Sequence, residues 1–150
     1  MKRNLKSILA LTVLTAAATW AGGLYLELGS PSANAEAQAL NAVLVARVTA
    51  CHEPALSTVT ANLVESRNGQ IVSKELKVVP LKTPGMYAVI GAVPKGGMID
   101  LAVTNPEYKD YRPRVFVRSD EKGVQWANVK RYFSKAPTDS DVKSFLEKSE

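Results

Sequence analysis

The adjacent pair Cys51-His52 is the part of the sequence best suited to chemistry. A thiolate and an imidazole are ligands that suit Cu(I) and other soft ions. However, consecutive residues on an extended chain point to opposite sides, and neither a second histidine nor a Cys-x-x-Cys motif accompanies the pair. We therefore interpret Cys51 first as a structural loop cysteine, with a copper site at Cys51 and His52 as the alternative.

Catalytic motifs are missing from the sequence. His52-Glu53 begins like the zinc-protease motif HExxH, but Leu56 occupies the position of the second histidine. No serine lies in a G-x-S-x-G motif, and the glycines do not have the spacing of a phosphate-binding or dinucleotide-binding loop. We expect a protein that is not an enzyme and that holds no cofactor, apart from the copper alternative.

Aromatic and basic side chains alternate late in the chain, a pattern typical of surfaces that bind polyanions. The residues assigned to a partner surface are Tyr108, Lys109, Tyr111, Arg112, Arg114 and, from a C-terminal helix, Phe145. An exported protein rarely meets nucleic acid, so the expected partner is a cell-envelope protein or an anionic envelope component such as phospholipid head groups. An ordinary charged exterior is the alternative interpretation.

The first 35 residues resemble an export signal. Three basic residues among the first six precede an apolar stretch at 8–20, and Ala33-Asn34-Ala35 has the small-x-small pattern of a cleavage site. We expect cleavage after Ala35, with an uncleaved inner-membrane anchor at residues 8–28 as the alternative. Either way, the remainder is expected in the periplasm or outside the cell.

Length and composition fit one domain behind this leader. The chain has 150 residues and a formal charge of +5, which falls to a mildly basic +3 (16 Lys and Arg against 13 Asp and Glu) once the first 35 residues are removed. Its single cysteine rules out an intrachain disulfide, so stability must come from the core. The expected organisation is a signal or anchor at 1–35, a β-sandwich at 36–135 and a C-terminal helical segment at 136–150.

Alternation of apolar and polar residues predicts seven strands with no helix between them. In the central stretch, 83–105, two apolar runs joined by Pro94-Lys95-Gly96-Gly97 predict a β-hairpin. Asp100 lies opposite the apolar face of the second run, so we expect that other face to be partly wet. Asn68-Gly69 predicts a turn between two further strands. The remaining runs lie at 42–50, 58–65, 71–81, 114–118 and 124–133.

The motifs of the central stretch resemble those of small exported β-sandwiches. Pro84-Gly85 followed by Tyr87, then Gly97, Leu101 and Val103, resemble the late strands of prealbumin-like (carboxypeptidase-regulatory-like) and FixH/YtkA-like domains. This resemblance implies an all-β, seven-stranded antiparallel Ig-like or prealbumin-like sandwich in an exported protein, with an accessory role in membrane complexes or metal handling. It carries no catalytic residue across.

The last residues predict a short helix. Thr138 can cap it, Asp139 and Asp141 fall in its first turn, and apolar residues recur at helical spacing after them. Together with the export signal, these features predict a non-catalytic extracytoplasmic binding or accessory module. Its expected contact surfaces are the loop at 105–113 and this helix.

Overall fold

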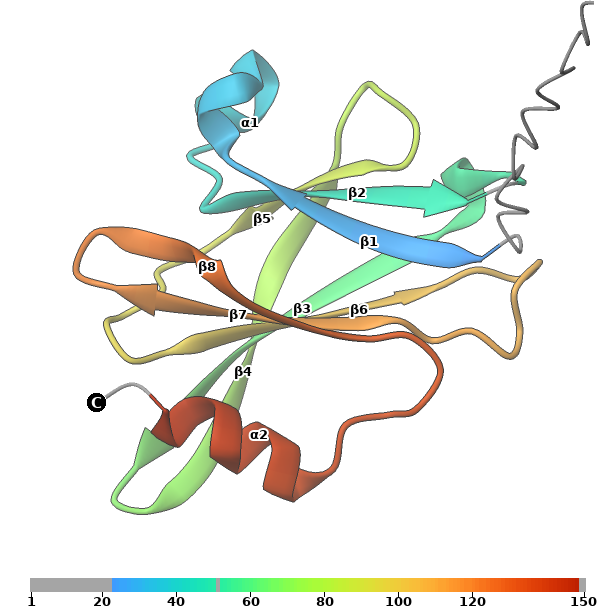
Figure 1. Cartoon of the computed structure of the whole chain (residues 1–150). Coiled ribbons are helices and arrows are strands. Elements are labelled where there is room, and N and C mark those ends of the chain that lie inside the picture. The colour runs from blue at the N-terminus through green and yellow to red at the C-terminus, as the bar shows by residue number, and fades with distance from the viewer. Residues whose placement is uncertain (1–22, 51, 149–150) are drawn as a thin grey trace, which may run out of the picture.

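The computed structural model describes residues 23–50 and 52–148. Eight strands form one antiparallel sheet in the order β1-β2-β5-β4-β3-β6-β7-β8, which curls into a half-barrel (Figure 1). The strands are β1 (Leu24–Gly29), β2 (Leu44–Ala50), β3 (Thr58–Arg67), β4 (Gln70–Pro80), β5 (Met86–Ile90), β6 (Met98–Thr104), β7 (Arg114–Asp120) and β8 (Gly123–Tyr132). The predicted antiparallel all-β class is confirmed.

Short helices complete the fold. They are α1 (Ala35–Ala39) and α2 (Asp139–Glu147), with single turns of 3-10 helix at η1 (Pro31–Ala33) and η2 (Pro54–Leu56). The predicted C-terminal helix is therefore present, and Thr138 caps it through a capping box with Asp141.

The prediction of seven strands is wrong, because β1 adds an eighth from the stretch assigned to the leader. Its side chains alternate: Leu24 and Leu26 are buried in the main core, whereas Tyr25 is exposed. All six residues of β1 pair with β2. The sheet thus begins upstream of the predicted boundary at residue 36, and cleavage after Ala35 would remove one of its edge strands.

The sheet is continuous because β4 contributes to both halves of it. Residues 70–76 of β4 pair with β3, and the following residues up to Pro80 pair with β5. Gly91, just after β5, lies against the residue where β4 changes partner: its φ is +151° and an added Cβ would lie 2.7 Å from Leu76 Cδ2. The predicted two-layered sandwich is accordingly replaced by one curled sheet whose halves share β4.

The predicted hairpin within residues 83–105 is also wrong. β5 pairs with β2 and β4, whereas β6 pairs with β3 and β7, so the two strands are not neighbours. The Pro94–Gly97 segment instead connects the two halves, and Gly96 N–H and Gly97 C=O bond to Ser119 at the end of β7. The Asn68-Gly69 hairpin is confirmed, with positive φ at both residues.

The concave face of the sheet encloses the main core. It contains apolar side chains from the strands, among them Leu44, Val89, Ile99, Leu101 and Val103. On the convex face, α1 covers Val45 and Ala88, while α2 covers Met98 and Phe116. The Asp100 face is only partly wet: Ala102 is half-buried and Thr104 is exposed there, whereas Asp100 itself is buried in an ion pair with Arg114.

Candidate functional site

The loop at 105–113, between β6 and β7, forms most of a surface hollow of about 410 Å³. Tyr108, Lys109, Tyr111 and Arg112 line it, as the predicted partner surface requires. The rings of Tyr108 and Tyr111 meet edge to face with centroids 6.3 Å apart. Leu56, which is half exposed, adds an apolar wall from η2.

Asn105 positions this loop. The side chain is buried, and its Nδ2 donates to Glu53 O at 3.0 Å and to Ser57 Oγ at 2.9 Å, while Oδ1 accepts from Glu107 N–H at 2.9 Å. Tyr87, from β5, also donates its hydroxyl hydrogen to Ser57 O. The loop is therefore held to the 53–57 segment by buried polar contacts, which fixes the wall of the hollow.

A second, more apolar hollow of about 320 Å³ adjoins the first. Tyr111 lines both, and the second is completed by Gly23, Leu24, Tyr25 and Phe133. Tyr25 and Phe133 meet edge to face with centroids 5.8 Å apart, so the start of β1 and the residue after β8 are in contact. Large aromatic side chains this exposed, 37% for Tyr25 and 49% for Phe133, often mark a contact surface.

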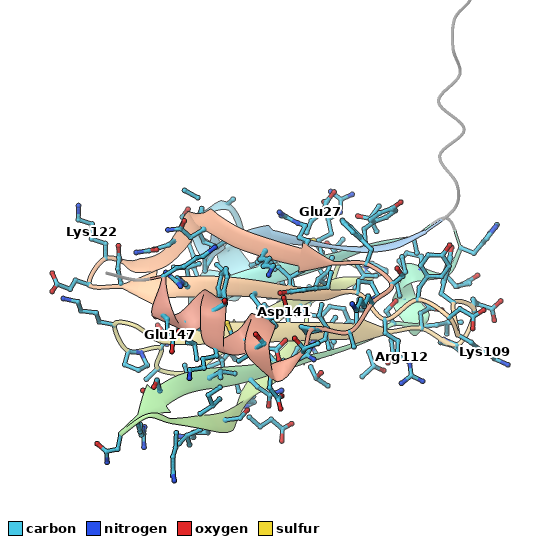
Figure 2. The ribbon with its side chains drawn as sticks, turned by 60° about the horizontal axis from the view of Figure 1, so that its bottom comes forward. Glu27, Lys109, Arg112, Lys122, Asp141 and Glu147 are labelled. Carbon is cyan, nitrogen blue, oxygen red and sulfur yellow. The ribbon has the colours of Figure 1, made fainter. Side chains whose placement is uncertain are left out.

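We call the surface formed by Tyr25, Leu56, Tyr108, Lys109, Tyr111, Arg112 and Phe133 the aromatic end. Figure 2 shows Lys109 and Arg112 at one extremity of the domain, opposite Lys122. Glu107 and Asp110 are exposed in the same loop but do not line the hollows. Arg131 and Lys135 are exposed two residues to either side of Phe133. The side chains that line the hollows are thus aromatic, aliphatic, cationic or uncharged.

The remaining two residues of the predicted partner surface lie elsewhere, on the convex face. Arg114 pairs with Asp100 and lies 5.6 Å from the centre of the Phe116 ring. Phe145 packs against Phe116 with centroids 5.6 Å apart and lies under the guanidinium of Arg118 at 4.8 Å. The predicted surface is therefore divided between the aromatic end and the packing of α2 on the sheet.

The predicted copper pair is only partly placed, because Cys51 lies outside the described residues. His52 is exposed, and its backbone N–H donates to the Tyr108 hydroxyl at 2.9 Å. Glu53, next in the chain, has φ +44° in the left-handed region. Within residues 23–50 and 52–148, no three His, Cys, Asp or Glu side chains group as metal ligands. The copper site remains a prediction.

Sequence reasoning missed the aromatic members of the site that come from distant elements. Tyr25 lies in the segment assigned to the leader. Phe133 ends the predicted run at 124–133, and the sequence does not indicate which residue packs against it. The alternation Leu-Tyr-Leu-Glu-Leu at 24–28 is the signal that could have revealed β1. The contact between Tyr25 and Phe133 joins the two edges of the curled sheet, and no pattern of neighbouring residues in the sequence indicates it.

Comparison of the chain with protein-family models, curated proteins and solved structures finds no match. In the described part of the chain, no helix has the length and apolar character needed to cross a membrane.

Proposed function

We propose that this protein is a non-catalytic accessory module of the cell envelope that rests on an anionic membrane surface through its aromatic end. The observation that carries the proposal is the position of Gly23. This residue, the first described, lines the aromatic hollow together with Tyr25, Tyr111 and Phe133. The proposed export segment therefore joins the domain at the aromatic end.

Covalent geometry brings that end close to the membrane. The apolar stretch at 8–20 ends three residues before Gly23, and an extended chain covers at most about 11 Å over three residues. Cleavage after Ala35 would cost the sheet β1, so we favour a retained N-terminal segment or a cut upstream of Gly23. While the leader is in the membrane, the aromatic end faces the head groups.

The chemistry of the aromatic end fits such a surface. Tyrosine and phenylalanine rings with polar surroundings favour the boundary between head groups and hydrocarbon. Lys109 and Arg112 line the adjoining hollow, and each cation near an anionic surface contributes about 1 kcal/mol of attraction. Glu107 and Asp110 offset part of this attraction, whereas Arg131 and Lys135 add to it.

Hydrogen exchange of the full chain in vesicles tests the proposal. Loop 105–113 should exchange more slowly in phosphatidylglycerol vesicles than in phosphatidylcholine vesicles. The double variant Lys109→Ala/Arg112→Ala should lose this difference, because two contributions of about 1 kcal/mol amount to roughly 30-fold in the constant for docking on the membrane.

The matched control is Lys74→Ala/Lys122→Ala, which removes two exposed cations elsewhere on the domain and should keep the protection. Equal exchange in the two lipids, or protection that survives in Lys109→Ala/Arg112→Ala, would contradict membrane docking. Mass spectrometry of the mature N-terminus separately determines whether the leader is retained.

A further inference from the structure

A third hollow, of about 440 Å³, lies away from the aromatic end, where the β7–β8 hairpin meets the last residue of the described chain. Its polar lining comes mainly from Lys95, Arg118, Asp120, Gln125, Asn128 and Lys148. Figure 2 shows Lys122, at the tip of the same hairpin, at the extremity opposite Lys109. This hollow plays no part in the proposed membrane contact.

Arg118 is the unusual residue of this hollow. The residue is only 7% exposed, and its Nε and Nη2 find no hydrogen-bond partner among the described residues. Burial lowers the pKa of the guanidinium, as expected for a cation removed from water. The Phe145 ring, 4.8 Å away, offers a cation-π contact but no hydrogen-bond acceptor.

Arg114 is a comparable cation of the same strand, but it has a carboxylate partner. It lies on the same convex face, four residues earlier on β7, and both Nε and Nη2 donate to the carboxylate of Asp100. Arg118 has no such carboxylate in the described part of the chain. Because buried charges in proteins are normally paired, the guanidinium of Arg118 lacks an acceptor that a ligand can supply.

The strand opposite Arg118 is locally irregular. Val117 pairs with Val129 and Arg118 pairs with Gln125, so residues 126–128 are extra on β8. This β-bulge places Asn128 beside Gln125 in the lining of the hollow, with Asn128 Nδ2 donating to Gln125 Oε1 at 2.7 Å. Bulges often adjust side chains next to binding sites, and this one lies directly opposite Arg118.

The charges around Arg118 favour an anion. Lys95 and Lys148 add two cations to the lining, although Lys95 also pairs with exposed Glu121. Asp120 is the acidic group of the lining, and its oxygens already accept from Lys122 N–H and Gln125 Nε2. These hydrogen bonds lower the pKa of Asp120, so it stays ionised, but they do not direct it to Arg118.

We propose that this hollow is an oxyanion site in which Arg118 binds a carboxylate or phosphate group, with Lys95 and Lys148 in support. Two sources can supply that group. One is a separate small molecule or phosphate ion. The other is Glu150 of this chain, which follows Lys148 by two residues and lies outside the described residues.

Nuclear magnetic resonance of the ¹⁵N-labelled full chain tests the site. Sodium phosphate and sodium acetate are titrated at constant ionic strength while the Arg118 Nε–H signal and the side-chain amides of Gln125 and Asn128 are followed. A saturable shift is expected. Arg118→Met should weaken it about 10- to 100-fold, since hydrogen bonds to charged groups carry binding energies of that size. The variant should still fold, because it replaces an unpaired buried charge with an apolar side chain.

Matched variants distinguish the sources. Lys122→Met removes an exposed cation of the same hairpin that does not line the hollow, and should bind like the parent chain. If Glu150 fills the site, the parent chain will not respond to added anions but Glu150→Gln will. If a free anion fills it, both chains will respond alike. Absence of a saturable shift in both chains, or equal binding by Arg118→Met, would overturn the proposal.

Discussion

Asn105 connects two segments that are 48 residues apart through bonds from one buried side chain. Asn105→Ala removes the donor to Glu53 O and Ser57 Oγ and the acceptor for Glu107 N–H. We expect the free energy of unfolding to fall by about 1–3 kcal/mol, because buried partners are left unsatisfied. Urea denaturation measures this change. Exposed Gln70→Ala serves as the control, and an Asn105→Ala chain as stable as that control would contradict the positioning role.

Asp141 makes the start of α2 sensitive to acid. Backbone and side-chain hydrogen bonds from Thr138, followed by one from Lys130, lower its pKa from 3.8 to about 2. Because the folded-state pKa is depressed, this stabilisation is fully present above about pH 4 and is lost as the pH falls through about 2.

The carboxyl ¹³C signal of Asp141 should therefore titrate near pH 2. Asp141→Asn should remove the acid-dependent part of the α2 signal, whereas Asp139→Asn, which leaves the Thr138–Asp141 bonds in place, should keep it. Titration of Asp141 near pH 4 in the folded protein would contradict this account of the helix cap.

A single substitution also tests the predicted copper site at Cys51 and His52. A Cu(I) site formed by this pair requires the thiolate, so Cys51→Ser should abolish copper loading of the anaerobic full chain. Elemental analysis after gel filtration gives the metal content. Met98→Leu is a suitable control, because Met98 is fully buried in the α2 cluster and should not affect loading. Equal copper in the parent chain and Cys51→Ser would eliminate the site.

At the scale of elements, β1 conflicts with the predicted cleavage site, because cleavage after Ala35 would remove a strand that pairs with β2. Each of the buried side chains of Leu24 and Leu26 contributes about 1.5–3 kcal/mol, out of a typical total stability of about 5–15 kcal/mol. A chain that begins at Glu36 should therefore be largely unfolded or should associate through the open edge of β2.

Circular dichroism and light scattering compare this truncated chain with one that begins at Gly23 and retains β1. A stable, monomeric chain from Glu36 would show that β1 is dispensable and that cleavage after Ala35 is structurally tolerated.

The sequence predicted elements well and their pairing poorly. Alternation is local, so β2 to β8 were found within a few residues, and the Asn68-Gly69 hairpin followed from its turn. The partners of β5 and β6 could not be read from proximity along the chain, because their connection crosses between halves of the sheet. The same limit hid the Asp100–Arg114 pair, which divides the predicted basic surface.

At the scale of the whole molecule, the two candidate binding surfaces lie at different extremities of the half-barrel. The aromatic end gathers residues from β1, the 105–113 loop and the segment after β8. The Arg118 hollow gathers residues from the β7–β8 hairpin, the segment before β6 and the end of α2. A module that rests on a membrane by the first extremity leaves the second accessible to soluble anions.

The sharing of β4 between both halves of the sheet constrains the order in which the protein can fold. The local β3–β4 hairpin can form early, but β2 must wait for β5, and β3 must wait for β6, each about forty residues further along the chain. The half formed by β1, β2, β5 and the end of β4 has all of its strands only at Ile90, and the other half only at Tyr132. More than half of the chain is therefore synthesised before either half of the sheet has all of its strands.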